Sequence, residues 1–294
     1  MNMNEYGEVK ENVSFKELTT YKIGGIAKTV VYPRNTDKLV KLIKDLNYNY
    51  MDYLIIGGGS NIIVPSTDYE GVVIKLDNIN KLEIDDCTVT VGAGYFVPKL
   101  VMETVNNGLK GLEWALGIPA TVGGMIVGNA GAYLSSTFDK LKSVTVIVNN
   151  ELKKLDASKI KHSYRNTIFK EDKKYVIVEA EFLLEKGNYD ESMSLLNDRK
   201  KRRLASQPLE YPSAGSVFRN PEGLYAGKLI EDLGLKGYSI GDAKISEKHA
   251  NFIINTGSCS GEEIIELIHL IETKVNEEYG IKLVLEQEII EWWL

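Results

Sequence analysis

The chain has 294 residues, of which 44% are hydrophobic and 26% are charged, as is ordinary for a globular protein. This length exceeds one typical domain, so we expect two or three units that each have a core. The net charge of −6 argues against a protein that binds nucleic acid or membrane surfaces. The polar N-terminus lacks a signal-peptide core, and no apolar run approaches the roughly 20 residues of a membrane span. We therefore expect a cytoplasmic protein with no membrane association and no obligate protein partner.

The cysteines and histidines give no pattern typical of a metal site. Cys87 and Cys259 lack the spacing of metal ligands, and we expect free thiols in a reducing compartment. The three histidines, His162, His249 and His269, are scattered along the chain. We expect no bound metal.

Hydrophobic periodicity predicts the elements. In the first third, a strand, a helix and a strand follow one another at 27–33, 35–47 and 52–57. Strands then predominate, with one helix at 95–108; they are expected at 71–76, 81–85, 87–94, 143–148, 151–155 and 175–185. A charged helix follows at 190–209. The last part contains a helix at 224–235, a strand at 250–255, a helix at 260–280 and a strand at 281–290.

This order of elements predicts the α+β fold class. Changes of pattern along the chain predict three domains, at 1–72, 73–190 and 191–294. The helix at 260–280 has the clearest boundaries, because Ser260 and Glu263 have the spacing of a capping box and Gly280 fits the end.

A glycine-rich segment, 57–61, directly follows an apolar strand. It consists of Gly57, Gly58, Gly59, Ser60 and Asn61. Consecutive glycines let backbone N–H groups converge on an anion, although a tight turn between strands would use the same residues. The segment is not a Rossmann fingerprint, because a strand follows it where a helix should begin.

A second glycine-rich segment, 117–133, is predicted to be a loop. Its candidate cofactor-binding residues are Gly117, Thr121, Gly123, Gly124, Asn129 and Gly131. Small residues let a large flat ligand approach the backbone, while glycine-packed turns would explain the same composition. Two such segments in one chain favour a phosphate-bearing cofactor, which these patterns alone do not identify.

Two further segments carry candidate chemical groups. Tyr164 and Arg165 lie in a polar segment, and arginine offers a planar fork to a carboxylate or a phosphate, although such a pair is also common on surfaces. Ser216 lies among small residues, where it serves either as a turn residue or as a proton donor. Arg219 and Asn220 follow it closely and offer donors to an anionic ligand.

The last predicted strand carries two glutamates. Its alternation puts Glu286 and Glu288 on one face. A solvated edge would place them in the same way, so the pattern alone leaves their role open.

Nine segments, in this order, resemble one family: the UDP-N-acetylenolpyruvoylglucosamine reductases, the MurB flavoenzymes of bacterial cell-wall synthesis. They are TTYKIGGIA, IIGGGSNIIV, GLEWALGIPATVGG, NAGAY, YRNTIF, PSAGSVFRNP, AGKLIEDLGLKG, SEKHANFIIN and YGIKLVLEQEII. The resemblance extends from Thr19 to Ile290, nearly the whole chain. The short interval from Arg165 to Ser216 resembles the subtype that lacks an extra tyrosine-bearing loop.

The resemblance implies a fold and a set of ligands. A two-part FAD-binding module, like that of the vanillyl-alcohol-oxidase (PCMH-type) flavoenzymes, would precede a C-terminal α+β domain that binds the substrate. Residues 57–61 would hold the FAD pyrophosphate, and residues 117–124 and 129–133 would line the rest of the cofactor. NADPH and UDP-N-acetylglucosamine enolpyruvate would be the co-substrates.

The resemblance also implies a role for each candidate group. In the family, NADPH gives a hydride to the flavin, which passes it to the enolpyruvyl group to yield UDP-N-acetylmuramate. Arg165 and a protonated Glu286 match the pair that stabilises the enolate-like species, and Ser216 matches the proton donor. The expected substrate-binding residues are Tyr164, Arg165, Arg219 and Asn220. The choice of Glu286 over Glu288 rests on motif alignment.

The chain departs from the family pattern at Ala120, where glycine is usual, and the alanine adds a methyl group beside the expected cofactor. Two alternatives remain, and Ala120 supports only the second. One is a flavin oxidoreductase of the same fold with another substrate. The other is a catalytically weak relative that binds flavin or a UDP-sugar.

Overall fold

The computed structural model describes residues 1–292, which fall into two compact units. Unit 1 comprises Met1–Glu11, Thr29–Gly58 and Gly71–Lys201. Unit 2 comprises Asn12–Lys28, Gly59–Glu70 and the residues from Arg202 onward. The finer division into three domains stays a prediction. Among residues 1–292, no helix has the length and apolar character that a membrane span requires.

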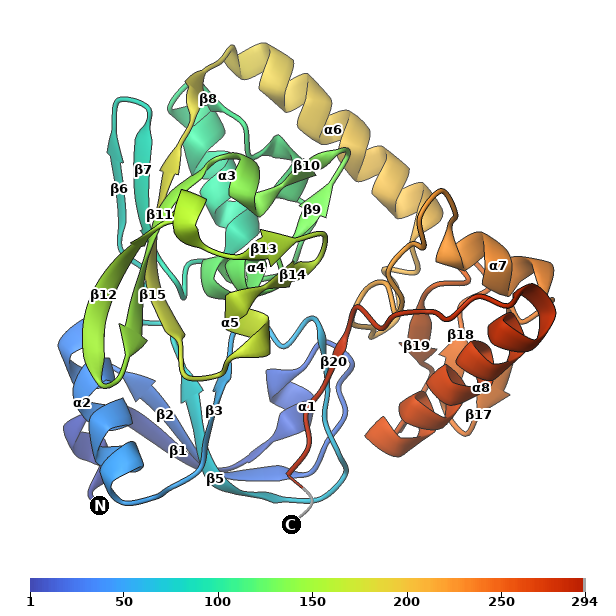
Figure 1. Ribbon diagram of the computed structural model, residues 1–294, viewed down its shortest axis with the longest axis horizontal. Coiled ribbons are helices and arrows are strands. Elements are labelled where there is room, and N and C mark those ends of the chain that lie inside the picture. The colour runs from blue at the N-terminus through green and yellow to red at the C-terminus, as the bar shows by residue number, and fades with distance from the viewer. Residues whose placement is uncertain (293–294) are drawn as a thin grey trace. The chain divides into compact units, whose positions relative to one another are not determined.

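Unit 1 contains a five-stranded antiparallel sheet in the order β12-β11-β15-β7-β6 (Figure 1). Its strands are β6 Leu82–Asp85, β7 Thr88–Gly92, β11 Leu141–Val148, β12 Glu151–Asp156 and β15 Val176–Leu183. All five lie where the sequence predicts strands. Valine and isoleucine side chains of β11 and β15 are buried in one hydrophobic core with those of the neighbouring helices, which stabilises the sheet.

Two amphipathic helices cover apolar surface in unit 1. Helix α2, Thr36–Tyr48, begins at Asn35, whose side chain accepts a hydrogen bond from the Lys38 N–H at 3.0 Å. Its buried residues recur three and four positions apart: Leu39, Leu42, Ile43 and Leu46. Helix α3, Val97–Asn106, has Pro98 in its first turn, where a missing N–H costs no helical hydrogen bond.

A four-stranded sheet has the order β1-β2-β5-β3. Its strands are β1 Gly7–Ser14, β2 Ile26–Pro33, β3 Tyr53–Ile56 and β5 Tyr69–Lys75. Strands β3 and β5 are parallel, with Ile56 opposite Lys75. Both strands therefore end at the first glycine-rich segment.

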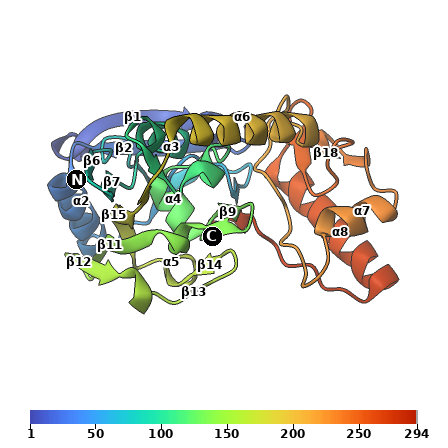
Figure 2. The same ribbon diagram turned by 90° about the horizontal axis from the view of Figure 1, so that it is seen from above.

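The smaller elements of unit 1 lie in its connections. They are the 3-10 helices η1 Met3–Glu5, η2 Glu113–Ala115, η3 Thr137–Asp139 and η4 Ala157–Lys159; the short strands β8 Leu109–Lys110, β9 Gly131–Ala132, β10 Ser135–Ser136, β13 His162–Ser163, β14 Asn166–Thr167 and β16 Glu185–Lys186; and the helices α4 Val122–Val127 and α5 Ile168–Glu171. Helix α6, Tyr189–Ser206, is one unbroken helix in Figure 2 and ends just before Pro208, as predicted.

Unit 2 contains a three-stranded sheet in the order β17-β18-β19, beside which helix α8 lies (Figure 1). The elements of this unit are α1 Phe15–Leu18, β4 Ile62–Ile63, α7 Ala226–Asp232, β17 Ser239–Ile240, β18 Ala243–Ile245, β19 Ile253–Asn255, α8 Gly261–Tyr279 and β20 Glu288–Ile289. The predicted capping box of Ser260 and Glu263 is confirmed, and so is the left-handed Gly280 at the end of α8.

Two predictions about local structure are wrong. The strand expected at 281–290 is reduced to Glu288–Ile289, paired with β4, and to an isolated bridge between Leu285 and Phe218, because its partners are short segments. The segment 117–133 is not a continuous loop. It contains α4, which Thr121 caps and whose apolar side chains are buried, so packing outweighs the low helix propensity of its glycines.

Candidate functional site

The two glycine-rich segments meet in unit 1. A Cβ atom on Gly57 would lie 2.5 Å from Oγ1 of Thr121, and one on Gly58 would lie 2.6 Å from the carbonyl oxygen of Pro119. Any side chain at either position would collide with the other segment. The close approach of the two segments therefore explains why both positions are glycine. The sequence had suggested only that the two segments bind the same ligand, whereas the structure shows that they are in direct contact.

The first glycine-rich segment leaves consecutive backbone donors unused. Among residues 1–292, the N–H groups of Gly58, Gly59 and Ser60 donate to no other group of the chain. The segment is also not a hairpin turn, because β3 before it pairs with β5, whereas β4 after it pairs with β20. Successive free N–H groups are the donors that an anion such as a pyrophosphate requires.

Lys75 is a charged residue that the sequence analysis missed. It is 9% exposed, and its Nζ donates to the carbonyl oxygen of Gly57 at 2.5 Å. Burial lowers the pKa of this lysine, and Asp77, 3.7 Å away, counteracts that shift. The ammonium group of Lys75 is thus hydrogen-bonded to the first glycine of the segment. The only sequence signal is a lysine within the apolar run 71–76.

Ala120 does not leave its methyl group exposed. The residue is buried and belongs to the hydrophobic core of unit 1, and its carbonyl oxygen accepts a hydrogen bond from the Val97 N–H at 2.9 Å. The extra methyl relative to glycine is thus packed within the protein.

Arg165 lies at the tip of a two-residue hairpin in unit 1. Strands β13 and β14 pair Ser163 with Asn166, so Tyr164 and Arg165 form the loop. The φ angle of Arg165 is +56°, a left-handed conformation that costs an L-residue roughly 1–2 kcal/mol. Strained residues of this kind cluster at functional sites, where the surrounding structure holds them.

The second glycine-rich segment holds the Arg165 side chain. Its Nη1 donates to the carbonyl oxygen of Asn129 at 3.4 Å, and its Nη2 donates to that of Gly131. A Cβ atom on Gly131 would lie 2.8 Å from Nη1, so glycine lets the guanidinium approach. The Asn129 amide donates to the carbonyl oxygen of Ser163 at 2.9 Å and supports the hairpin. The guanidinium carbon lies 5.0 Å from the Tyr164 ring centroid.

Ser216 lies in unit 2, on a segment that is paired along both edges. On one edge it forms an antiparallel bridge with Phe252, and the Val217 N–H donates to the carbonyl oxygen of Asn251 at 2.9 Å. On the other edge, the Glu286 N–H donates to the carbonyl oxygen of Val217 at 2.8 Å. The hydroxyl of Ser216 hydrogen-bonds to no other group among residues 1–292, so it can still form a hydrogen bond with a ligand.

The Asn251 side chain also holds this segment. Its Oδ1 accepts from the Phe218 N–H at 3.0 Å, and its Nδ2 donates to the Phe218 carbonyl oxygen at 2.8 Å. The Asn251 N–H donates to Nδ1 of His249 at 3.2 Å. Burial lowers the pKa of His249, which favours the neutral ring that this contact needs. Sequence analysis did not single out Asn251.

Asn61 lies beside both candidate glutamates. Its Nδ2 donates to the carbonyl oxygen of Glu286 at 3.2 Å, and its own carbonyl oxygen accepts from the Glu288 N–H at 2.9 Å. A predicted cofactor residue thus contacts the predicted catalytic Glu286, and also its alternative Glu288, within unit 2. The backbone N–H of Glu286 donates to the Ser216 segment, whereas that of Glu288 donates to Asn61.

Arg219 and Asn220 follow on the same segment. The Nε of Arg219 is buried and has no hydrogen-bond partner in the described part of the chain. The side-chain oxygen of Asn220 accepts from the Ala226 N–H at 3.1 Å and shapes the start of α7. Arg219 thus retains an unused donor, while Asn220 already has a local structural contact.

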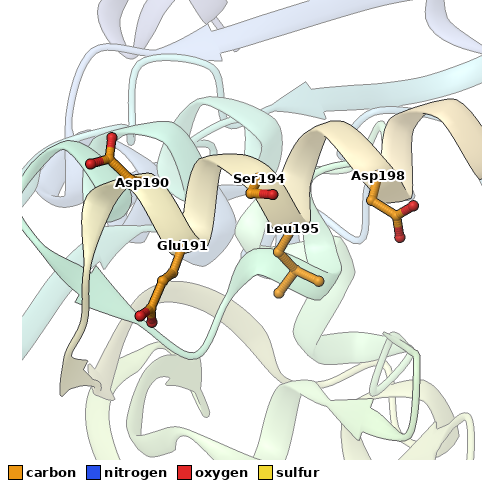
Figure 3. A pocket seen from close by; sticks show the side chains of 5 residues that line it. All are labelled: Asp190, Glu191, Ser194, Leu195 and Asp198. Atoms are coloured by element: carbon orange, nitrogen blue, oxygen red, sulfur yellow. The ribbon is translucent and has the colours of Figure 1, made fainter.

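A shallow hollow along α6 offers no alternative site. It is lined by the side chains labelled in Figure 3: Asp190, Glu191, Ser194, Leu195 and Asp198. All five project from one helix, so no second element encloses a ligand. Across residues 1–292 there is also no group of three or more acidic, cysteine or histidine side chains arranged to hold a metal.

Comparison with families of known proteins gives two matches. Residues 27–151 match the family described as FAD binding domain. Residues 207–290 match the family described as UDP-N-acetylenolpyruvoylglucosamine reductase, C-terminal domain. The predicted α+β architecture, a PCMH-type FAD-binding module followed by a second α+β domain, is confirmed by these matches.

Relatives match over nearly the whole chain. A UDP-N-acetylenolpyruvoylglucosamine reductase of Caldanaerobacter subterraneus subsp. tengcongensis is 41% identical over 97% of this chain and 94% of its own. That of Carboxydothermus hydrogenoformans is 43% identical over 96% and 94%. The crystal structure of UDP-N-acetylenolpyruvylglucosamine reductase (MurB) from Thermus caldophilus aligns with a TM-score of 0.83 at 31% identity, covering 97% of this chain and 99% of that one.

Proposed function

Because the chain belongs to the UDP-N-acetylenolpyruvoylglucosamine reductase family, we propose that it reduces UDP-N-acetylglucosamine enolpyruvate to UDP-N-acetylmuramate with FAD and NADPH. This reaction supplies a peptidoglycan precursor. We also propose the division into two FAD-binding subdomains, 1–72 and 73–190, and a substrate domain, 191–294. A cytoplasmic location fits the nucleotide-sugar substrate and NADPH.

The residues present fit FAD. The unused N–H groups of Gly58, Gly59 and Ser60 would bind the pyrophosphate, and Lys75 would add positive charge beneath that segment. Gly57, which approaches Thr121, keeps the two glycine-rich segments together. Around the rest of the cofactor we propose Asn61, Gly117, Thr121, Gly123, Gly124, Asn129 and Gly131. Bound FAD supplies the hydride transfer from NADPH to the vinyl carbon of the substrate.

Ser216 is the proposed proton donor. Its segment is fixed on both edges, while its hydroxyl keeps its hydrogen-bonding capacity for the substrate. The hydroxyl proton passes to the carbon next to the one that receives the hydride, which completes the saturated product. This placement of Ser216 is the single structural observation that carries the proposal.

Two groups are proposed to stabilise the negative charge that develops on the substrate carboxylate. The guanidinium of Arg165 is oriented by backbone carbonyls, so it needs little reorganisation to act as a donor. Glu286 is the proposed second group, acting as a neutral acid. Glu288 is the alternative, two residues further on, and Glu286→Gln and Glu288→Gln tested separately will show which carboxyl is required. We propose that Tyr164, Arg219 and Asn220 bind the substrate.

Visible spectroscopy of the purified protein tests the proposed function. We expect flavin bands that bleach with anaerobic NADPH and return when UDP-N-acetylglucosamine enolpyruvate is added. Bands that bleach but do not return would favour a flavin oxidoreductase with another substrate. A protein that binds flavin and is not bleached by NADPH would favour the catalytically weak relative.

A further inference from the structure

Gln287 lies between Glu286 and Glu288 in the sequence, and its side chain is buried in unit 2. It is 3% exposed. Its Nε2 donates to the carbonyl oxygens of Ala214 at 3.1 Å and Gly215 at 3.2 Å. These two residues directly precede Ser216, the proposed proton donor. The Gln287 amide therefore fixes the backbone immediately before it.

Tyr21 fixes the orientation of this amide. Its hydroxyl is fully buried and donates to Oε1 of Gln287 at 3.1 Å. A tyrosine hydroxyl is protonated at neutral pH and can donate, and burial raises the pKa of Tyr21 further. With Oε1 accepting, both Nε2 hydrogens meet carbonyl oxygens. The reversed amide would set its oxygen against two other acceptors, and only one orientation satisfies all the groups.

Asn255 connects the same network to the start of the Ser216 segment. Its Nδ2 donates to the carbonyl oxygen of Tyr21 at 2.9 Å, and its N–H donates to that of Pro212 at 2.9 Å. Asn255 is itself 4% exposed. Tyr21, Gln287 and Asn255 therefore form a buried network, here called the amide network, which contacts the chain at Pro212, Ala214 and Gly215.

Gly215 makes the position of Ser216 depend on this network. Its φ angle is +76°, and no atom lies within 4 Å of the place where a Cβ would stand. Glycine is thus present for its backbone conformation and not for close packing, and it brings no side-chain contact of its own. The direction in which the chain enters Ser216 is set by the two carbonyls that Gln287 binds.

We infer that Gln287 is a positioning residue for proton transfer by Ser216, with Tyr21 as the group that orients its amide. This inference rests on the proposed function, in which Ser216 protonates the substrate. Its chemical partner is the backbone of residues 214 and 215, and it does not contact the substrate. A positioning role predicts that loss of Gln287 slows the half-reaction that needs the proton and spares the one that does not.

The first experiment measures both half-reactions by stopped-flow absorbance of the FAD-loaded Gln287→Leu protein. Reoxidation by UDP-N-acetylglucosamine enolpyruvate should slow by about 10- to 100-fold, because small displacements of a reacting group have effects of this size. Its solvent deuterium isotope effect should rise, since proton transfer becomes rate-limiting. Reduction by NADPH should keep the rate of the unchanged protein. Gln207→Leu is the matched control, since Gln207 is the other glutamine of the chain and its Oε1 has no partner among the described residues.

The second experiment asks whether a donor at position 287 restores the rate. In Gln287→Glu, an ionised carboxylate would face two carbonyl oxygens, whereas the protonated acid donates to one of them. The reoxidation rate of Gln287→Glu, relative to the unchanged protein, should therefore rise as pH falls. The thermal unfolding temperature of Gln287→Glu, measured at the same pH values, separates recovery of the rate at constant stability from recovery of the fold.

Three outcomes separate the possibilities. If the unchanged protein is not reoxidised by the enolpyruvyl substrate, the proposed function fails. If it is reoxidised and Gln287→Leu matches it, the positioning role is overturned and the function stands. If Gln287→Leu slows both half-reactions equally and its thermal unfolding temperature falls, Gln287 is merely structural and the inference is again overturned.

Discussion

The hairpin that carries Arg165 and the segment that carries Ser216 hold their functional groups in different ways. Arg165 has a left-handed backbone conformation, and its guanidinium donates to the carbonyl oxygens of Asn129 and Gly131, the latter a glycine that permits close approach. Ser216 has no such strain at its own φ, and its neighbours are bound by the buried amides of Gln287 and Asn251.

The difference shows two routes to a fixed catalytic group. One uses local backbone strain and the absence of side chains, which a short stretch of sequence can specify. The other uses buried polar side chains that come from distant positions and must all be satisfied at once. In the Arg165 hairpin, substitutions that relieve the strain should keep the fold stable but reduce function. Around Ser216, removal of any one hydrogen-bond partner should reduce function.

Removal of the Ser216 hydroxyl should have the largest effect. Ser216→Ala should lower the rate of flavin reoxidation by about 10²- to 10⁴-fold, because a general acid typically contributes that much. Flavin reduction by NADPH should be largely intact, and stopped-flow absorbance separates the two steps. Ser213→Ala, in the same segment, is the matched control. A Ser216→Ala protein that reoxidises at the unchanged rate would remove Ser216 from the mechanism.

Substitution of Arg165 should separate function from strain. Arg165→Ala and Arg165→Gly should both lower turnover by about 10²- to 10³-fold, the usual value of one preorganised donor. Arg165→Gly should be more stable than Arg165→Ala by about 1 kcal/mol in urea denaturation, because glycine adopts the left-handed conformation freely. Equal stability of the two variants would show that the hairpin carries no strain at this residue.

Replacement of Lys75 should weaken cofactor binding and increase the stability of the apoprotein. Lys75→Met should weaken FAD binding about tenfold, or ~1.4 kcal/mol, as measured by titration of the apoprotein. Because burial lowers the folded-state pKa of Lys75, the charged form costs stability below that pKa, and this cost fades as pH rises through it. Apo Lys75→Met should thus be more stable at neutral pH, by a margin that narrows at high pH. Lys99→Met, on the exposed side of α3, is the control.

The smallest expected effect concerns His249. Its folded-state pKa is lowered, mainly by burial, so the unfolded chain binds the proton more readily. Stability should therefore fall as pH drops below the ordinary histidine value of about 6.5. His249→Asn keeps an acceptor for the Asn251 N–H and should show a flatter pH profile of unfolding between roughly pH 5 and 7. A profile identical to that of the unchanged protein would assign the pH dependence to other groups.

Sequence could predict the parts of this molecule that local patterns specify. The sheet of unit 1 follows from its valine and isoleucine runs, α8 follows from Ser260, Glu263 and Gly280, and motif resemblance indicates Arg165 and Ser216. Sequence could not predict that Gly57 meets Thr121 or that Gln287 meets Tyr21, because each contact joins segments far apart in the chain. The predicted strand at 281–290 failed for the same reason, since its extent depends on the length of its partners.

The most direct test of the proposed function is a single anaerobic turnover with product analysis. The purified, FAD-loaded protein is reduced with one equivalent of NADPH and then mixed with UDP-N-acetylglucosamine enolpyruvate. We predict that the flavin absorbance returns as one equivalent of UDP-N-acetylmuramate forms. Return of the absorbance without that product, or a flavin that stays reduced, would contradict the assignment of the substrate and with it the role of Ser216.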